Sequence, residues 1–404
     1  MISSATRILL YIVALSMLLC ACDNFTMSED QTNRFVRYYP TSLFYNEEGY
    51  DMAQLPDGGY LVISTTFWAE GDITDGEIML IMADEFGMEK ENTPILIANQ
   101  GNDFGYRVVS VSDGYVIAGS SKQDPNSFGF IVKVKPSGEL VWKYTLGTAP
   151  QQEFFGITAS NDGGFILTGY IDETGGDRQI YLVKTNSLGL TIWERAIGFT
   201  GYNDIGEAVV ELNNRIIIAG TTAPLSSSSG NSRLLILNTN SEGKGMTEYR
   251  ISAEGNLTGS DMVVDDNDNI IILGNHENLT ADLSSLYFAK IKLEGFNNEL
   301  ITVLNATSVD FLESLHGESM VISRDKSLAI CGWKGKQPDR DILFAQIDQD
   351  FNLKNIQLFG STGDQSGSGI CITTDGGYAF TGGTNIAGKI TTTLIKLGPD
   401  GKLY

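Results

Sequence analysis

Histidine and cysteine are scarce in this sequence, with two histidines and four cysteines among 404 residues. Neither histidine, His276 or His316, stands at a spacing typical of metal ligands. No P-loop, dinucleotide fingerprint or nucleophile elbow is present. These absences argue against a zinc site, a catalytic triad and a nucleotide cofactor. We therefore expect no metal and no cofactor, and the sequence identifies no catalytic residues.

Basic residues are also scarce. Lysine and arginine number 27 against 50 aspartates and glutamates, which gives a formal net charge of -23. A nucleic-acid site needs a basic stripe that displaces counterions from phosphates, so nucleic acid is excluded as a partner. Electrostatic docking on anionic lipid is disfavoured as well. The simplest interpretation of the acidic composition is that it keeps the protein soluble.

Charged residues make up only 19% of the chain, while 45 glycines and 9 prolines indicate many turns rather than many helices. A chain of 404 residues also exceeds the length at which one hydrophobic core stops growing. It must therefore be divided into domains or built from repeats. An all-β fold is favoured.

The first residues resemble an export signal. Arg7 precedes an apolar run from Ile8 to Leu19, and small residues follow. A run of about 12 residues is too short for a permanent membrane helix, which needs about 20. We therefore predict a signal peptide over residues 1–21.

The end of this signal, Leu19-Cys20-Ala21-Cys22, resembles the lipobox of bacterial lipoproteins. The resemblance implies cleavage before Cys22 and acylation of that cysteine, for example with palmitate, so that lipid alone anchors the chain. Cys20 fits less well, because Leu19 would then occupy the small-residue position. A plain secretory signal remains the alternative.

Residues 22–33 are polar and lack a period, which predicts a flexible tether after the lipidated cysteine. The mature chain is then expected to be extracytoplasmic, in the cell envelope. Asp23 resembles the acidic export signals that follow the cysteine of Bacteroidetes surface lipoproteins. The outer membrane or the cell surface is therefore the expected location, although these residues leave the membrane and leaflet open.

An apolar run that ends in a small residue recurs seven times with a mean spacing of about 53 residues, which is typical of a propeller or an array of repeats. The seven runs are Tyr60–Ser64, Tyr115–Gly119, Phe165–Gly169, Ile216–Gly220, Ile270–Gly274, Leu328–Gly332 and Tyr378–Gly382.

Each run follows a turn signal such as Asp113-Gly114, and a shorter apolar stretch precedes that turn, so every unit begins with a hairpin. A third strand such as 130–134 and a fourth such as 140–144 complete the unit. Four antiparallel strands form the blade of a propeller. We expect the second strand to be buried on both faces and the fourth to expose one face to water.

Six of the runs end in glycine, at a position where a side chain would obstruct close backbone approach near the axis. These glycines are Gly119, Gly169, Gly220, Gly274, Gly332 and Gly382.

The last unit stops at Tyr404, shortly after its third strand, 393–397, and so lacks a fourth strand. The segment Arg34–Tyr39 alternates in polarity and precedes the first hairpin. Pairing the two ends would close the ring and cover an exposed edge. We therefore predict an all-β, seven-bladed β-propeller over residues 34–404, with an N-terminal strand completing the last blade. The propeller is expected to be a monomer.

The segments Asp162–Gly169 and Asp375–Gly382, together with Trp142 and Trp193 in fourth strands, resemble the propeller repeats of bacterial extracytoplasmic lipoproteins. The segment Lys135–Trp142 is similar to quinoprotein-type repeats. Quinoproteins hold a quinone and calcium at the axis, but none of their catalytic residues has a counterpart here. The resemblance implies the fold and not an activity.

Ligands are expected on the face where the loops from fourth to first strands and from second to third strands converge. Aromatic rings beside hydrogen-bonding groups suit sugars and peptides. The alternative is that the rings cap the core and the acids cap turns. The candidates are Trp68, Tyr170, His276, Trp333, Glu47, Asp103, Glu153, Asp204 and Asp364.

Two further patterns have simple interpretations. The acidic run Asp265–Asn269 is not an EF-hand loop, because Ile270 stands where glycine is required and His276 where glutamate is required. A hairpin turn is expected there. Cys331 and Cys371 fall on second strands of adjacent blades, where free thiols are the commoner outcome and a disulfide is left open.

These observations favour a non-enzymatic binding or scaffolding propeller for a glycan, a peptide or an envelope protein. The alternative is a cell-envelope enzyme, such as a glycan lyase or hydrolase, that uses carboxylates in the axial cleft. A third hypothesis is a structural subunit of an outer-membrane assembly. The sequence does not identify the ligand.

Overall fold

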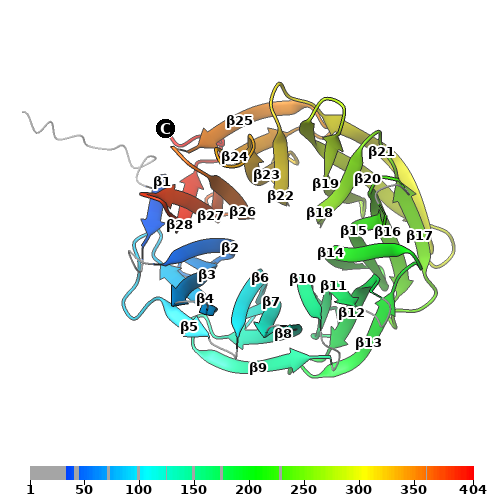
Figure 1. The fold of residues 1–404 in the computed structure, drawn as a ribbon, viewed down its shortest axis with the longest axis horizontal. Coiled ribbons are helices and arrows are strands. Elements are labelled where there is room, and N and C mark those ends of the chain that lie inside the picture. Colours follow the sequence, from blue (N-terminus) through cyan, green and yellow to red (C-terminus); the bar gives the residue numbers. More distant parts are fainter. Residues whose placement is uncertain are drawn as a thin grey trace, which may run out of the picture.

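The computed structural model describes residues 33–40, 45–70, 73–97, 101–123, 125–147, 151–172, 176–226, 230–360 and 362–404. These residues form 28 strands in seven four-stranded antiparallel sheets. Figure 1 shows the sheets arranged as blades around a central axis. The predicted seven-bladed propeller is confirmed. No helix of membrane-spanning length and hydropathy occurs in the described ranges.

Each blade runs from an inner strand at the axis to an outer strand at the rim. The inner strands are β2 (Asn46–Gln54), β6 (Asn102–Val111), β10 (Gln152–Ala159), β14 (Tyr202–Leu212), β18 (Asn256–Val264), β22 (Leu315–Ile322) and β26 (Gln365–Ile372). The second strands are β3 (Tyr60–Glu70), β7 (Gly114–Gln123), β11 (Phe165–Asp172), β15 (Arg215–Pro224), β19 (Ile270–Asn278), β23 (Leu328–Lys334) and β27 (Tyr378–Ile386).

The third and fourth strands complete the blades. The third strands are β4 (Ile73–Ala83), β8 (Asn126–Val134), β12 (Arg178–Thr185), β16 (Arg233–Asn240), β20 (Leu283–Glu294), β24 (Asp341–Ile347) and β28 (Lys389–Leu397). The outer strands are β5 (Ile95–Ile97), β9 (Leu140–Leu146), β13 (Thr191–Ile197), β17 (Thr247–Ile251), β21 (Leu300–Val309), β25 (Leu353–Phe359) and β1 (Phe35–Tyr39).

The two ends of the chain share the last blade. β1 pairs with β28, from Phe35 opposite Lys396 to Tyr39 opposite Thr392, and Figure 1 shows them side by side. The Tyr39 hydroxyl donates a hydrogen bond to the Gly87 carbonyl of the first blade at 2.8 Å. The N-terminal strand therefore closes the ring as predicted, and it covers an edge that would otherwise carry unpaired backbone groups.

The hydrophobic core lies between the blades. Ile63 and Leu80 of the first blade pack in one cluster with Ile117 and Val132 of the second, and all four are fully buried. The second strands are buried on both faces over most of their length, whereas the outer strand β13 alternates between exposed and half-buried residues. Because each sheet packs against two neighbours, apolar residues are required on both of its faces.

The aspartate of the turn signal has a second role besides shaping the turn. In four blades its carboxylate pairs with a lysine of the third strand, as in Lys184 with Asp162 at 2.9 Å and Lys290 with Asp265 at 2.9 Å. The same Asp265 carboxylate accepts hydrogen bonds from the backbone of Asn267 and Asn269. The acidic run at 265–269 is therefore the predicted hairpin turn.

Cys331 and Cys371 are both free thiols. The Cys331 side chain is buried between the sixth and seventh blades, where it belongs to the same apolar cluster as Phe344 and Phe380. Burial raises the pKa of Cys371 to about 12. The two side chains thus fill the core as small apolar groups.

The repeated glycines stand where predicted, opposite the inner strand. A Cβ on Gly119 would lie 1.8 Å from the Phe104 carbonyl oxygen, and one on Gly169 would lie 1.8 Å from that of Glu153. In each case the inner strand has a β-bulge beside this contact. The expected obstruction is confirmed for these glycines, whereas the first blade has Ser64 at the same position, opposite Gly49.

We predict that Gly169→Ala lowers the free energy of unfolding by about 1–3 kcal/mol or more, because the new methyl group must push β10 and β11 apart. Urea and thermal unfolding would measure the change. Gly245→Asn is the matched control, since no atom lies within 4 Å of the added Cβ and asparagine tolerates its φ of 61°. Equal stability losses in both variants would contradict the close-approach explanation.

Candidate functional site

A β-bulge occurs at the same place in all seven inner strands, directly after the residue that faces the repeated small residue of the second strand. The extra residue of each bulge projects toward the axis. All seven extra residues line one cavity of about 560 Å³. They are Tyr50, Tyr106, Phe155, Glu207, Ser260, Glu318 and Ser368.

Three consecutive blades contribute an aromatic wall, which consists of Tyr50, Tyr106 and Phe155. The Tyr50 and Tyr106 ring centroids are 5.5 Å apart, and those of Tyr106 and Phe155 are 5.2 Å apart, both with edge-to-face geometry. Phe104 stacks on Tyr106 at 5.7 Å. Packed edges of this kind hold each ring in place and present a continuous apolar surface to the cavity.

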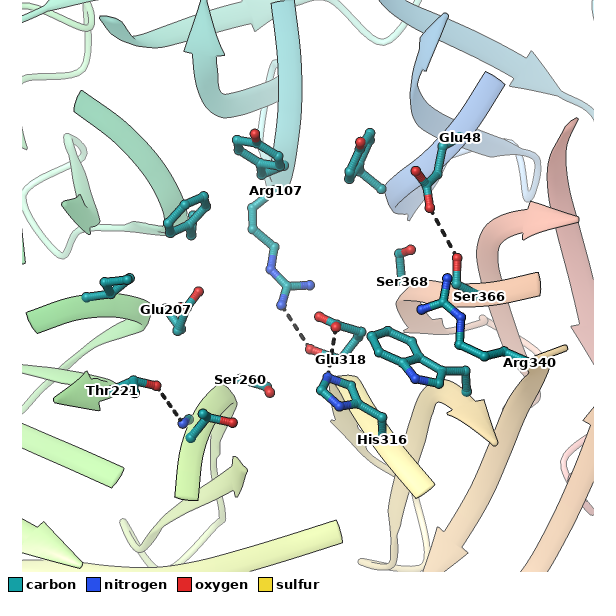
Figure 2. A pocket seen from close by; sticks show the side chains of 17 residues that line it. Glu48, Arg107, Glu207, Thr221, Ser260, His316, Glu318, Arg340, Ser366 and Ser368 are labelled. Carbon is teal, nitrogen blue, oxygen red and sulfur yellow. Dashed lines mark hydrogen bonds and ion pairs between the residues drawn. The ribbon is translucent and has the colours of Figure 1, made fainter. Parts of the chain in front are cut away.

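The other four blades contribute a polar wall, which consists of Glu207, Ser260, Glu318 and Ser368. Figure 2 shows these side chains around the cavity. Glu318 Oε1 lies 3.1 Å from His316 Nε2. Within the described residues, the Glu207 carboxyl group makes no hydrogen bond, so it is available to a ligand.

Arg107 crosses the cavity from β6, and its Nη2 donates a hydrogen bond to the Glu318 backbone carbonyl on β22 at 3.1 Å. Arg107 comes directly after the bulge of its strand. The other inner-strand residues that line the cavity are either the extra residue of a bulge or lie before it. Arg107 therefore lies at the deep end of the cavity. Burial disfavours its charge, but Asp261 and Asp51 outweigh that effect and raise the pKa of the guanidinium.

The two aspartates beneath Arg107 also join adjacent blades. Asp51 accepts hydrogen bonds from its neighbour Met52 and from Val108 of the second blade, both at 2.8 Å. Asp261 accepts from Met320 of the sixth blade at 2.9 Å in the same way. Burial raises the pKa of Asp51 to about 6. These buried carboxylates are thus satisfied by backbone donors, as buried charges must be.

Burial and the negative charge of Glu318 raise the pKa of Glu207 to about 8, although the positive charge of Arg107 acts to lower it. At neutral pH the Glu207 carboxyl group therefore keeps its proton.

Burial also raises the pKa of Glu48, which accepts a hydrogen bond from Ser366 Oγ at 3.1 Å at the edge of the cavity. No cluster of three or more metal-ligating side chains occurs among the residues that the structure describes.

The open end of the cavity is bordered by a stack of three side chains. The His316 and Trp333 rings are parallel, with centroids 3.9 Å apart, and the Arg340 guanidinium lies 4.7 Å from the Trp333 centroid on that ring. Asp364 holds Arg340 by two hydrogen bonds, at 2.8 and 2.6 Å. The charge of Arg340 is therefore already compensated.

The structure brings together some of the residues predicted for the ligand site. Trp333 lines the cavity, and Asp364 positions Arg340 beside it. Glu153 and Tyr170 lie behind the aromatic wall, where Glu153 accepts hydrogen bonds from Tyr170 at 2.7 Å and from Tyr106 at 3.1 Å. These two residues support the wall without lining the cavity.

Other predicted residues lie elsewhere. His276 bonds Ser308 Oγ at 3.1 Å and the Glu254 carbonyl at 2.7 Å, and it does not line the cavity. Asp204 is buried and accepts a hydrogen bond from the Phe199 backbone at 2.7 Å, which fixes the loop before β14. Glu47 and Asp103 are also buried, and each lies two residues before the glycine that precedes the bulge of its strand, as Asp204 does. The Trp68 side chain and Cys22 lie outside the described residues.

The residues that form the two walls were missed by the sequence analysis, although a signal for them exists. In six of the seven inner strands the extra residue follows a glycine, as in Gly105-Tyr106 and Gly206-Glu207. A Cβ on Gly206 would lie 2.1 Å from Thr168 Oγ1 of the preceding blade. A glycine that recurs before the hairpin turn in six of the seven blades therefore marks the residue that reaches the axis.

Comparison with known proteins supports the fold alone. No protein-family model matches the chain, and no curated protein matches it. A protein of unknown function from Dyadobacter fermentans is similar in structure over 89% of this chain and 97% of its own, with a TM-score of 0.54 and 9% identity. Sqt1 from Chaetomium thermophilum is similar over 88% of this chain and 83% of its own, with a TM-score of 0.52 and 13% identity.

The raised pKa of Glu207 predicts a pH dependence of stability. Between the ordinary value of 4.5 and about 8 the folded protein keeps a proton that the unfolded chain releases, so the free energy of unfolding falls as the pH rises. We expect Glu207→Gln to remove the contribution of Glu207 to this decline, while Asp51 and Glu48 still contribute. The variant should be more stable than the parent at pH 8.5 by ~1 kcal/mol or more. Urea unfolding from pH 5 to 9 measures it.

The matched control is Glu139→Gln, because Glu139 is an exposed glutamate whose side chain is 65% accessible on an outer turn. Its stability curve is expected to run parallel to that of the parent. A Glu207→Gln curve that also runs parallel to that of the parent would mean that Glu207 has its ordinary pKa in the folded protein. That result would contradict the raised pKa of Glu207.

Proposed function

We propose that this chain is a non-enzymatic binding module of the cell envelope whose axial cavity receives a projecting group of a glycan, a peptide or a protein partner. The observation that carries the proposal is the convergence of seven bulge residues on one cavity, with an aromatic wall opposite a polar wall. The fold does not require this arrangement, since a bulge residue could be any small or apolar side chain.

Three features of the cavity suit a binding role. Its volume of about 560 Å³ lies within the range typical of ligand sites, roughly 300–1,000 Å³. Aromatic side chains supply contact area, and Glu207, Ser260 and Ser368 supply groups that can fix orientation. Arg107 spans one end, and we propose that a chain terminus or a side chain of the ligand enters from the other.

We predict that Phe155→Ala weakens binding by about tenfold, because it removes one ring of the aromatic wall. Ligands would be found by screening glycan and peptide arrays with the wild-type protein, and affinities measured by calorimetry. Tyr249→Ala is the matched control: Tyr249 is 42% exposed on the outer strand β17, and its variant is expected to bind as the parent does. Equal weakening in both variants, or in neither, would place the ligand outside the cavity.

A second candidate function is hydrolysis or elimination on a glycan. The observation in its favour is that Glu207 keeps its proton at neutral pH while the negative charge of Glu318 lies close enough to raise its pKa. Two carboxyl groups held in different environments can divide the roles of general acid and base. Turnover of an array ligand that is lost in both Glu207→Gln and Glu318→Gln would support this function, whereas binding without turnover supports the first.

The proposal includes a lipid anchor at Cys22, which is supported by the lipobox resemblance of Leu19–Cys22. We predict that the full chain, expressed in a bacterium that processes lipoproteins, incorporates an alkyne-tagged palmitate and partitions with membranes. Cys22→Ala should lose both properties, and Cys20→Ala should keep them. A label that persists in Cys22→Ala would contradict the assignment of this cysteine.

A further inference from the structure

The cavity carries more carboxyl groups than its cations compensate. Glu48, Glu207 and Glu318 line it together with two arginines. Arg340 is held by Asp364 through two hydrogen bonds. Arg107 interacts most strongly with Asp261 and Asp51, and less strongly with Glu318 and Glu207. Because both arginines also face aspartates, the site has a deficit of positive charge, and this deficit grows when Glu207 ionises.

The aromatic wall and two of these acids surround the same space. Tyr50, Tyr106 and Phe155 belong to β2, β6 and β10. Glu207 belongs to β14, the inner strand next to β10, whereas Glu318 belongs to β22 across the axis. Aromatic rings attract cations through their negative faces, and they do so most strongly in desolvated sites. A cavity that combines such rings with carboxyl groups is suited to an organic cation.

We propose that the axial cavity binds an organic cation, with its charge between the Glu207 and Glu318 carboxyl groups and its apolar surface against the aromatic wall. This inference rests on the proposed binding function and names the chemistry of its ligand. The source that the observations favour is a lysine or arginine side chain of a basic peptide, because the net charge of -23 attracts basic polypeptides.

Binding of a cation is linked to release of a proton from Glu207. The charged groups that face Glu207 are Glu318 and Arg107, whereas the adjacent strands present the uncharged Phe155, Ser260 and Thr221. A cation favours the ionised carboxylate, so affinity must rise as the pH rises toward about 8 and beyond. If the bound cation lowers the pKa of Glu207 by about one unit, affinity rises about tenfold across this range.

The test uses a pair of probes with the same shape and different charge. Choline carries a quaternary ammonium that does not titrate, and 3,3-dimethyl-1-butanol is its neutral counterpart. We expect choline to bind the whole mature chain at least about tenfold more tightly than the alcohol at pH 9. Choline affinity should fall between pH 9 and pH 6.5, and any affinity for the alcohol should not change. Equal affinities for the two probes would overturn the proposal.

Two variants separate a direct role of the acids from a structural one. Glu207→Gln should abolish the pH dependence and leave choline affinity at its low-pH value. Glu318→Gln should weaken choline at every pH and move the midpoint of the dependence to lower pH, because its charge no longer raises the pKa of Glu207. Glu139→Gln, on an outer turn, should match the parent. An unchanged pH dependence in Glu207→Gln would overturn the assignment.

A second comparison identifies the source of the cation and separates this inference from the binding function. A lysine-rich peptide should compete with choline, and its acetylated form should not. Competition by a glucosamine oligomer alone would support the cation site and overturn the peptide source. A neutral array ligand whose binding Phe155→Ala weakens, in a protein that does not discriminate choline from the alcohol, would overturn the cation inference and leave the binding function intact.

Discussion

The close approach of two backbones beside each inner-strand bulge is the constraint on which the site depends. At Gly169 and Gly220 the second strand lies so near the inner strand that a Cβ would fall within 2 Å of a carbonyl oxygen. The inner strand accommodates this approach by inserting one extra residue, which is turned toward the axis. Because the unit recurs in every blade, seven side chains meet around one cavity.

The same constraint explains why charged residues can persist near the axis. The inner strands follow their bulges with backbone N–H groups, and those of Val108 and Met320 satisfy the carboxylates of Asp51 and Asp261 in the neighbouring blades. Those carboxylates in turn stabilise the charge of Arg107, which spans the axis between β6 and β22. An ionic layer of this kind would be costly in a dry core without such partners.

The sequence was sufficient to predict the fold because each blade repeats the same local signals. Turn residues such as Asp162-Gly163, a fully apolar second strand and a terminal glycine recur at a regular spacing, and Arg34–Tyr39 supplies the one missing strand. The site was only partly predictable. Trp333 could be placed because it follows the apolar run. Tyr106 and Glu207 are chemically unlike and correspond only in their position as the extra residue of a bulge.

Acids at loop ends were misleading for a physical reason. Asp204 ends a loop on the predicted ligand face, but its carboxylate is buried against the Phe199 backbone rather than directed to the cavity. Sequence position places such a residue on the correct face and cannot tell whether its side chain caps the loop or faces a ligand. That distinction depends on register within the inner strand, which the bulge shifts by one residue.

The central claim is that the bulge side chains, rather than the rim loops, receive the ligand. A crystal structure of the protein soaked with choline tests it most directly. We expect density for the trimethylammonium group on the axis, in contact with Phe155 or Tyr106 and with Glu207. Density confined to the outer loops, with the axial cavity containing only solvent, would contradict it.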